Sequence, residues 1–433
     1  MTREYKDSGI EWIGQIPKEW EVKSVKRLCN NITDGSHFSP ATQNDGKPYI
    51  TVSNVYNDMV HIEEAAKISN EDFNVLVANG CQPTKGSVLL SKDGTVGRTA
   101  IVEENDYVVL SSLGILSPSD SIIPKYLKYQ LDSDSLQAQM QLAMAGSALR
   151  RITITKINKL VGLLPPLSEQ QKIADYLDKV SGEVDEMVAL QETMIEELKA
   201  YKQSVITEAV TKGLNLNVPM RNSGIDWIGD IPEGWEVRRL KDVFILKTGT
   251  TPKEYEKGLD QRSLINWFTP ADIDEMNCEL NASQRYLSKE VVLNEGIQLY
   301  PKGSLIFVGI GASAGKIGYA NVEGYSNQQI TAIIPKDSHC YSKYFYYYMI
   351  AGRKRIRDNA FFTTLPIINN SYLSGVKVLF PAIEEQRAIA SYLDTKCSEI
   401  DSLIALKQAK IDELKEYKKS VIYEYVTGKK EVV

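Results

Sequence analysis

The sequence predicts an α+β protein in which two mixed α/β domains are separated by two long antiparallel helices, in a pseudo-twofold internal repeat. Three observations predict this fold class. Blocks near the start recur half-way along the chain, two proline-free stretches carry apolar residues at helical spacing, and short β-branched runs fill the segments between them. At 433 residues the chain also exceeds the size at which single hydrophobic cores stop growing, so more than one domain is expected.

The repeat consists of three pairs of matching blocks. Ser8-Gly-Ile-Glu-Trp-Ile-Gly-Gln-Ile-Pro-Lys-Glu-Trp-Glu-Val22 recurs as residues 223–237 with 11 of 15 positions identical. The other pairs, at an offset of 216, are Glu169–Asp178 with Glu385–Asp394 and Glu197–Thr211 with Glu413–Thr427. The stretches between the blocks, residues 23–162 and 238–378, share little beyond short turn motifs and length. The chain therefore contains two copies of similar flanking blocks, which we call the frame, around two segments of different sequence.

Each long helix is predicted from a stripe of apolar residues spaced three and four apart. The sequence Pro165-Pro-Leu-Ser168 gives a start signal with a capping serine. The residues expected in the seam between the helices are Ile173, Leu177, Val184, Leu198, Tyr201 and Val205 with Ile389, Leu393, Ile400, Leu414, Tyr417 and Val421. A helix of about 44 residues extends about 66 Å and needs a partner, for which the other copy of the repeat is suited. The alternative is that each helix packs only on its own neighbouring domain.

These patterns divide the chain into four parts. The first domain is expected at 1–165, a central long helix at 166–212, the second domain at 213–380 and a C-terminal long helix at 381–433. Strands are expected in the first domain at Tyr49–Val52, Ser87–Leu90, Thr99–Val102 and Tyr107–Leu110. In the second domain they are expected at Asn266–Thr269, Ser304–Val308 and Gln329–Ile334, followed by the aromatic run Tyr344–Tyr348.

Composition indicates an intracellular folded protein. The chain starts without the apolar core of a secretion signal, and its apolar runs are too short to span a bilayer, so a cytoplasmic location without membrane contact is expected. The five cysteines are widely spread with no C-x-x-C pair and no histidine at ligand spacing, which disfavours disulfides and a metal site. The net charge of -6 argues against a basic surface over the whole molecule but allows local basic faces.

Two basic segments and two glycine loops are the candidates for binding nucleic acid. The basic segments are residues 150–159, beginning Arg150-Arg151, and residues 352–357, with Arg353 and Arg355; a solvated face is the alternative for each. The loops, Lys92-Asp-Gly-Thr-Val-Gly-Arg98 and Gly309-Ile-Gly-Ala-Ser-Ala-Gly-Lys316, offer exposed amides and cations that can meet phosphate oxygens, although a plain hairpin turn is equally compatible. From these segments and loops, the candidate DNA-binding residues are Lys92, Thr95, Arg98, Arg150, Arg151, Ser313, Lys316, Arg353 and Arg355.

Catalytic motifs are incomplete. Phe307-Val-Gly-Ile-Gly311 has the F-x-G-x-G form of a methyltransferase cofactor loop, but no N-P-P-Y or D-P-P-Y motif occurs. A phosphate-binding P-loop fails because Ile310 stands where glycine is needed and Ile317 where serine or threonine is needed. Glu21-Val-Lys23 lacks the Pro-Asp partner of a nuclease motif. We therefore expect no catalytic residue in this chain.

The repeated motifs resemble those of type I restriction–modification specificity subunits over the whole chain. The similarity lies in the W-I-G-x-I-P-x-x-W openings, the P-P-L-x-E-Q-x-x-I-A-x-Y-L-D helix start and the E-L-K-x-Y-K-x-S-V-I-x-E-x-V-T helix ends. The segments Thr33–Pro40 and Thr248–Pro252 look like the early loops of the family's recognition domains, and Asn266–Ile273 and the glycine loops look like their central motifs. The resemblance thus adds further candidate DNA-binding residues at or beside the early loops, namely Ser36, His37, Thr250, Thr251 and Lys253. The acidic net charge departs from a typical DNA-binding surface and implies that partners share phosphate neutralisation.

The resemblance implies a non-catalytic, sequence-specific DNA-binding subunit. Each domain would read one half of a bipartite target in double-stranded DNA, with the helices as spacer and docking site for two methyltransferase subunits and two restriction/translocase subunits in the full complex. No cofactor is expected on this chain, because S-adenosylmethionine, ATP and Mg would bind the partner subunits. The alternatives are a specificity module of a split-site methyltransferase system without a nuclease subunit, a single-chain nuclease–methyltransferase, and a structural coiled-coil scaffold.

Overall fold

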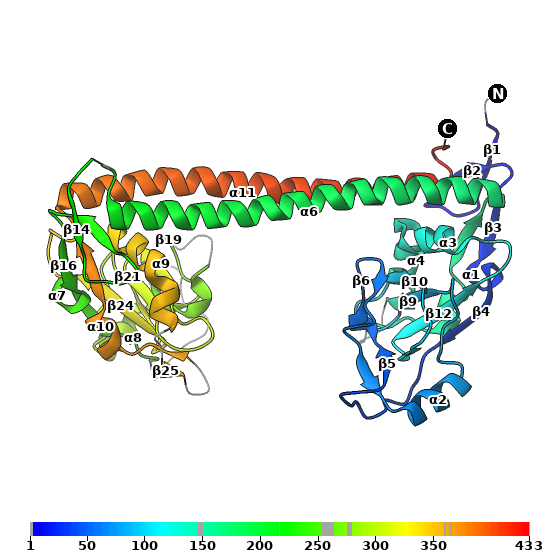
Figure 1. The fold of residues 1–433 in the computed structure, drawn as a ribbon, viewed down its shortest axis with the longest axis horizontal. Helices are drawn as coiled ribbons and strands as arrows, with labels where there is room; N and C mark the ends of the chain where they lie inside the picture. The colour runs from blue at the N-terminus through cyan, green and yellow to red at the C-terminus, as the bar shows by residue number, and fades with distance from the viewer. Residues whose placement is uncertain are drawn as a thin grey trace. The chain divides into compact units, whose positions relative to one another are not determined.

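The computed structural model describes residues 3–145, 150–215, 217–252, 264–274, 279–358, 361–362 and 366–432. It divides into two compact units (Figure 1). Unit 1 comprises Met1–Gln191 and Ala409–Val433, and unit 2 comprises Glu192–Gln408. Each unit therefore contains one α/β domain together with a segment of both long helices.

The domain of unit 1 is built on two sheets. The larger is antiparallel in the order β10-β9-β12-β4, with β4 (Cys29–Asp34), β9 (Val88–Ser91), β10 (Thr99–Ile101) and β12 (Leu113–Pro118). The smaller has the order β11-β5-β8, with β5 (Lys47–Ile50), β8 (Ala66–Ile68) and β11 (Val108–Val109), and β11 pairs with β5 in parallel. A hairpin of β6 (Val55–Tyr56) and β7 (Met59–Val60) lies between β5 and β8 in the sequence.

The domain of unit 2 has closely related sheets, but its larger sheet has one further strand, β19 (Glu279–Leu280), which pairs in parallel with β22. Its larger sheet, in the order β17-β24-β21-β22-β19, consists of β17 (Phe244–Thr248), β19 (Glu279–Leu280), β21 (Leu305–Val308), β22 (Ile317–Ala320) and β24 (Ile330–Pro335). Its smaller sheet, in the order β20-β18-β23, consists of β18 (Leu264–Phe268), β20 (Tyr286–Ser288) and β23 (Gly324–Ser326), again with one parallel pair. A hairpin of β25 (Phe361–Phe362) and β26 (Pro366–Ile367) completes the strands of this domain. The two domains thus share a fold despite their different sequences.

Matching small sheets frame each domain. Unit 1 has β1 (Tyr5–Asp7) with β2 (Gln15–Pro17) and β3 (Glu21–Ser24) with β13 (Val161–Leu164). Unit 2 has β14 (Met220–Asn222) with β15 (Asp230–Pro232) and β16 (Glu236–Arg239) with β27 (Lys377–Phe380). The repeated openings of the sequence therefore form the same structure twice, and the strand before each long helix pairs with the strand that enters the domain.

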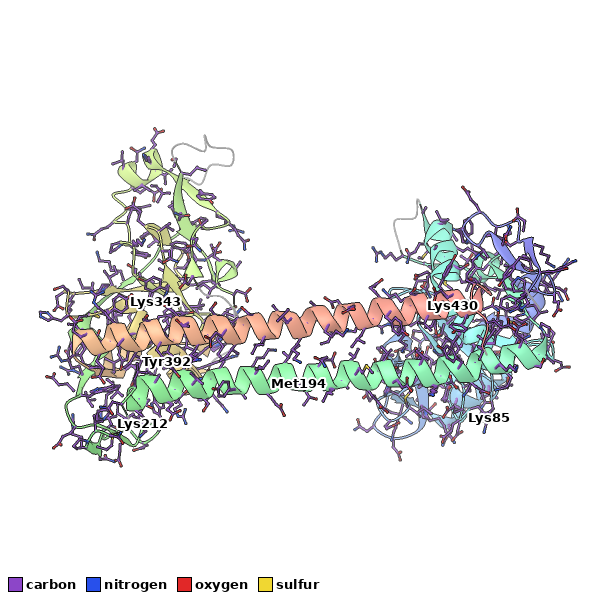
Figure 2. The ribbon with its side chains drawn as sticks, turned by 90° about the horizontal axis from the view of Figure 1, so that it is seen from above. Lys85, Met194, Lys212, Lys343, Tyr392 and Lys430 are labelled. Carbon is purple, nitrogen blue, oxygen red and sulfur yellow. The ribbon has the colours of Figure 1, made fainter. Side chains whose placement is uncertain are left out.

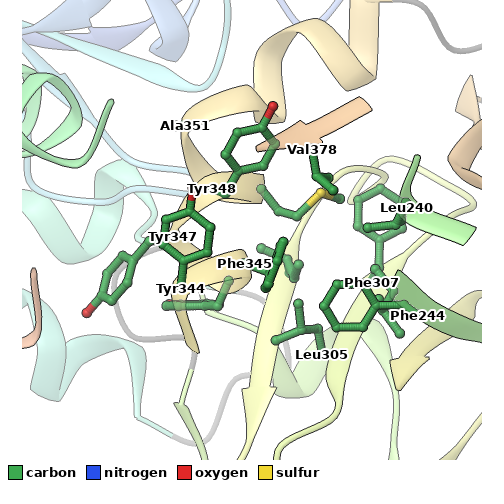
Figure 3. Close-up of a cluster of buried hydrophobic side chains, with 14 of the residues drawn as sticks. Leu240, Phe244, Leu305, Phe307, Tyr344, Phe345, Tyr347, Tyr348, Ala351 and Val378 are labelled. Carbon is green, nitrogen blue, oxygen red and sulfur yellow. The ribbon is translucent and has the colours of Figure 1, made fainter. Parts of the chain in front are cut away.

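The helices of the domains cover the sheets. Unit 1 contains α1 (Val25–Leu28), α2 (Asn70–Ala78), α3 (Pro124–Asp132), α4 (Asp134–Met144), α5 (Ile154–Ile157) and the 3-10 turn η1 (Val52–Asn54). Unit 2 contains α7 (Leu240–Val243), α8 (Lys289–Asn294), α9 (Ser342–Asp358), α10 (Asn370–Gly375) and the 3-10 turn η3 (Pro270–Asp272). The aromatic run Tyr344–Tyr348 lies in α9 and is buried, with Phe345 packed edge-to-face on Phe244 of β17 (Figure 3).

The two long helices are confirmed as α6 (Leu167–Lys212) and α11 (Ile383–Val426), which pack together. They are antiparallel, since Asp185 pairs with Lys418 in unit 1 while Lys202 pairs with Asp401 in unit 2. Ten of the expected seam residues are buried or half-buried: Ile173, Leu177, Val184, Leu198, Val205, Ile389, Leu393, Ile400, Leu414 and Val421. None of the helices among the described residues is long and apolar enough to cross a membrane.

Two of the seam predictions are wrong. The side chains of Tyr201 and Tyr417 are 57% and 53% exposed, so neither lies in the seam. Each tyrosine directly precedes a lysine, Lys202 or Lys418, whose side chain is only 20% exposed and occupies the position next to the partner helix. Either the tyrosine or the lysine fits a spacing of three or four residues. The sequence analysis selected the tyrosine because it is apolar, but the aliphatic stem of a lysine can also line a seam. The sequence analysis also omitted buried seam residues, namely Ile195, Ile206, Ile404 and Ile411.

The repeated frame makes the same contacts in both units. The indole of Trp20 donates to Glu169 of α6 at 2.9 Å, and that of Trp235 donates to Glu385 of α11 at 2.9 Å. Next to each glutamate, a fully buried glutamine, Gln170 or Gln386, bonds three backbone groups. The frame therefore fixes the start of each helix on its domain through buried polar bonds, which are costly to leave unmade.

A helix of each domain contacts both long helices. In unit 2, Lys343 of α9 lies 2.9 Å from Asp394 of α11 (Figure 2), and the hydroxyl of Tyr344 donates to the carbonyl of Val210 in α6 at 3.1 Å. In unit 1, Lys125 pairs with Asp178 of α6, and Tyr126 donates to the carbonyl of Val426 in α11 at 3.2 Å. Each domain thus holds the beginning of one long helix and the end of the other.

Candidate nucleic-acid interface

Three loops of unit 1 meet at one edge of the larger sheet. The loop after β4 runs beside the turn before β12, because Ser36 N–H donates to Val109 at 2.8 Å and Ser111 N–H to Ser36 at 2.9 Å. The glycine loop between β9 and β10 joins them where Lys92 N–H donates to Ser112 at 2.8 Å. Glycine is required at position 35, since a Cβ there would overlap the carbonyl of Val109. We call this edge the loop edge of unit 1.

The first basic segment lies against this glycine loop. Ile152 N–H donates to the carbonyl of Lys92 at 2.9 Å, and Gly94 N–H donates to that of Arg150 at 3.1 Å. The guanidinium of Arg151 pairs with Asp93 at 3.0 Å. The glycine loop and the first basic segment, which are more than fifty residues apart in the sequence, therefore lie side by side. Arg150 and Arg151 are both exposed.

Unit 2 has an equivalent loop edge. A Cβ at Gly249 would overlap the carbonyl of Ser326, just as at Gly35 in unit 1. The turn before β24 touches the second glycine loop, because Gly309 N–H donates to Gln329 at 2.8 Å. The segment before α10 pairs with the same loop through Ile368 N–H and the carbonyl of Gly309 at 2.7 Å. Both domains therefore place the same four chain segments at one edge.

The second basic segment, at the end of α9, also lies beside its glycine loop. A Cβ at Gly315 would stand 3.7 Å from side-chain atoms of Arg353 and Arg357. Lys316, in the same loop, is half-buried. Arg355 is exposed and lies over the ring of Trp227 at 5.0 Å. A basic surface thus borders the loop edge of unit 2, in keeping with binding to phosphates.

Lys92 departs most from the expected exposure. Its side chain is 1% exposed, with Nζ 3.1 Å from the carboxylate of Asp34 at the end of β4. This burial does not support the expectation that Lys92 meets a phosphate; its charge instead joins β4 to the glycine loop. Asp34 also lies 3.3 Å from the exposed ring of His37. The sequence analysis missed Asp34 because nothing in a linear pattern shows that it would face a lysine 58 positions later.

The remaining candidates occupy the loop edges in different ways. Ser36 is buried and bonds the backbone of Phe38, whereas Thr95 and Arg98 are exposed. In unit 2, Thr250 and Thr251 are exposed and bond Tyr325 and Gln328, and Ser313 is half-buried. Lys253 lies outside the described residues.

Two features of the loop edges escaped the sequence analysis. Thr51 and Asn54 form a capped 3-10 turn after β5, and Thr269 and Asp272 form the same turn after β18. The shared pattern T-x-x-[N/D] is the signal that could have matched these segments. The second feature is Gln328, an exposed residue in the turn before β24, which carries no motif at all.

Titratable groups near the sheets show no activated nucleophile. Burial raises the pKa of the Cys29 thiol to about 12. Burial also raises the pKa of Cys81, and the nearby Asp34 carboxylate adds to this effect. Both thiols stay protonated at neutral pH, the opposite of what nucleophilic chemistry requires. Among the described residues, no cluster of His, Cys, Asp or Glu could hold a metal ion.

Comparison with known proteins identifies the family. The model of the type I restriction modification DNA specificity domain matches residues 17–200 and 232–416. The type I restriction enzyme MjaVIII specificity subunit of Methanocaldococcus jannaschii is 24% identical over 440 residues, covering 96% of this chain and 94% of that protein. The EcoKI specificity subunit of Escherichia coli K12 is 24% identical over 350 residues, covering 75% of this chain and 70% of that protein.

Solved structures share the fold. A chain from a structural study of complex assembly and conformational transition of the type I R-M system matches with a TM-score of 0.71 at 17% identity, covering 95% of this chain and 98% of that one. The HsdS subunit of Thermoanaerobacter tengcongensis matches with a TM-score of 0.51 at 18% identity over the same shares. Two matched domains and two long helices account for most of the sequence. Members of the type I restriction–modification DNA specificity family bind bipartite DNA targets. The chain belongs to this family and is a specificity subunit, the non-catalytic subunit of a type I system.

Proposed function

We propose that each unit of this chain reads one half of a bipartite target in double-stranded DNA through its loop edge. The supporting observation is that two domains with closely related sheets place corresponding segments at one edge, yet present different side chains there. Unit 1 offers arginine and aspartate at its edge, whereas unit 2 offers hydroxyls and amides. A common frame with different hydrogen-bonding groups is what two different half-sites require.

In this proposal, the recognition domains are residues 1–165 and 213–380, and the long helices 166–212 and 381–433 are the spacer between them. The glycine loops and the basic segments position the DNA through its phosphates. Exposed groups at the loop edges, including His37, Thr95, Thr250 and Thr251, lie where they can approach base edges.

The helices dock two copies of a methyltransferase subunit in this proposal. Unit 1 exposes Met187 and Leu190 on α6 and Tyr417 on α11, and unit 2 exposes the equivalent Leu403, Leu406 and Tyr201. Tyr417 directly precedes the seam residue Lys418, and Met187 directly precedes the half-buried Val188, so on antiparallel helices they fall on the same side of the pair. Large exposed apolar groups in a cluster mark interaction sites, and a duplicated cluster suits two copies of one partner.

The chemistry then belongs to the partners. The methyltransferase subunits would bind S-adenosylmethionine, and two restriction/translocase subunits would use ATP and Mg. The solved type I assembly with which this chain shares its fold supports such a complex.

The decisive experiment co-expresses the chain with its methyltransferase subunit and maps methylated bases. We expect one asymmetric bipartite site and tight, salt-sensitive binding that the chain alone lacks. Methylation or cleavage by the chain alone would reject the non-catalytic assignment. DNA methylation in an organism without a nuclease subunit would favour a stand-alone methyltransferase system.

The docking surface is tested by changing one copy at a time. Leu190→Asp or Leu406→Asp should each reduce the mass of the complex by one methyltransferase subunit, and the double variant should bind none. Ser402→Glu is the matched control, because the equivalent position in α6 is already Glu186. Full assembly of the double variant would place the docking surface elsewhere.

A further inference from the structure

Unit 2 carries an exposed amide side chain, Gln328, in the turn that joins the segments of its loop edge. Gln328 stands in the turn between β23 and β24, next to the two residues that contact the other loops. Its neighbour Asn327 donates its N–H to the carbonyl of Phe268, just before η3, and its neighbour Gln329 accepts from Gly309 of the glycine loop. The close approach of Gly249 to Ser326 and Asn327 brings in the fourth segment. The turn that carries Gln328 therefore touches the early loop, the end of β18 and the glycine loop.

The other amides at this edge are occupied within the protein. Asn327 donates to the side chain of Gln329 at 3.0 Å and accepts from its N–H at 3.1 Å, and both residues are half-buried. Asn370 uses both ends of its amide, on Thr248 at 2.8 Å and on Thr331 at 2.6 Å. These bonds hold the shape of the turn. Asn369, before α10, is exposed but accepts from the N–H of Tyr372 as the cap of that helix, whereas Gln328 is exposed and has no such role in a helix.

Gln328 is also held in one orientation. The hydroxyl of Thr251, on the early loop, donates to its Oε1 at 2.5 Å. An amide oxygen accepts two hydrogen bonds and the NH₂ group donates two, so this contact leaves one acceptor and both donors for a ligand. Fixing a long side chain beforehand reduces the entropy lost on binding. Thr251 is thus a positioning residue for Gln328.

We propose that Gln328, oriented by Thr251, reads an adenine in the half-site of unit 2, an inference that rests on the proposed DNA-binding function. A glutamine amide matches the donor and acceptor that adenine presents side by side in the major groove, N6–H₂ and N7. The neighbouring cations at Lys316, Arg353 and Arg357 suit the phosphates on either side. In unit 1 the corresponding turn position is Ser111, so this contact belongs to the second half-site alone.

The first experiment measures binding of the complex with its methyltransferase to duplexes in which each base pair of the second half-site is replaced in turn. For the unaltered protein, one adenine should be preferred about 5- to 150-fold. Gln328→Ala should remove this preference at that base pair only. Gln328→Glu should transfer it to cytosine, because a carboxylate accepts from the cytosine N4 donor.

Two further measurements separate recognition from structure. Replacing the adenine by 7-deazaadenine should weaken binding of the unaltered protein but leave Gln328→Ala unaffected. Thr251→Val should lower the preference, and Thr251→Ser should restore it, with melting temperatures unchanged. Gln203→Ala is the control, since that exposed glutamine also bonds a threonine hydroxyl but lies on α6.

The outcomes distinguish failure of the proposed DNA-binding function from failure of the proposed adenine contact. If the complex binds no specific sequence, the proposed function itself fails. If it binds a bipartite site and Gln328→Ala keeps every base preference, Gln328 is not a base-reading residue. Loss of preference in the first half-site would equally overturn the inference.

Discussion

The ammonium group of Lys202 on α6 lies 2.7 Å from the carboxylate of Asp401 on α11, and Lys418 stands in the same relation to Asp185 at 2.8 Å. These are the same two positions of the repeat, with the helices exchanged. Each helix therefore carries one lysine and one aspartate that pair with the aspartate and the lysine of the other helix. Such self-complementarity is the property that lets two identical chains form a closed interface.

A half-chain ending near Met220 should therefore dimerise. In unit 1, Val421, Ile422 and Val426 of α11 close the core of the first domain. The half-chain has the identical residues at 205, 206 and 210, which a second copy can supply. With methyltransferase present, we expect methylation at a palindromic site made of two inverted first half-sites. Solution mass and methylation mapping test this, and a stable monomer or the original asymmetric site would contradict it.

The charge pairs between the long helices allow a specific test of the interface in this dimer. In the half-chain, Asp185→Lys places two lysines at each contact and should raise the dissociation constant several-fold, since exposed pairs contribute about 0.2–1 kcal/mol each. The double change Asp185→Lys with Lys202→Asp recreates opposite charges and should restore it. Equal weakening in both variants would mean that these pairs do not lie at the interface.

Exchange of residues 238–378 for the corresponding domain of another family member should change one half of the methylated site. The frame on either side is the part of the chain that the two units share, and it keeps the pairs of Glu236 with Phe380 and Val237 with Leu379 at the junction of β16 with β27. Methylation mapping before and after the exchange is the test. A change in both halves would show that the two readers are not independent.

Trp20→Phe should destabilise unit 1 by about 1–3 kcal/mol, because it leaves the buried frame without the indole bond to Glu169. Trp235→Phe should cost unit 2 a similar amount, since Glu385 loses the same bond. Thermal unfolding of both variants checks this. Unequal losses would mean that the matched bonds do not contribute equally to the two units.

Lys92 and Lys316 should behave differently although both were chosen as phosphate contacts. Lys92→Met should lower stability by about 1–3 kcal/mol, because the half-buried Asp34 carboxylate loses its cation. Lys316→Ala should instead weaken all DNA sites about equally and reduce the salt slope by about one. Thermal melts and salt titrations distinguish these results. An unchanged melting temperature together with a reduced salt slope for Lys92→Met would show that Lys92 contacts DNA phosphate after all.

Gly35→Ala and Gly249→Ala should each impair one half of DNA recognition. The new methyl group would meet a backbone carbonyl, so the loop edge must shift. Gly182→Ala in α6 is the control, because its Cβ meets nothing within 4 Å and alanine favours the helix by about 1 kcal/mol. Base preference at each half-site is the readout. Unchanged preference in both variants would remove these loops from recognition.

Periodicity and repetition predicted the frame because they depend on local rules. The long helices follow from apolar spacing, and the matching of Ile173 with Ile389 follows from the offset. The error at Tyr201 arose because the spacing rule accepts either of two adjacent positions, and only the packed structure shows that Lys202 takes the seam.

The loop edges depend on contacts between distant segments, which one sequence does not display. The glycine loops were found from their composition, but the buried pairing of Lys92 with Asp34 joins two strands that are not adjacent in sequence. The likeness of the two domains was also hidden, since four strands of their larger sheets and all three strands of their smaller sheets correspond in order while their residues differ. A fold tolerates such differences provided that hydrophobic pattern and turn geometry are kept.

The place of Val426 in the core of unit 1 has a consequence for the order of synthesis. Residues 409–432 leave the ribosome after the whole of unit 2, so the first domain to be made is the last to be completed. At about 5–20 residues per second, this delay is on the order of 10–40 seconds. During that interval the hydroxyl of Tyr126 and the site for Ile422 await their partners. A ribosome that stops before the end of α11 would therefore release a protein damaged in the domain that was translated first.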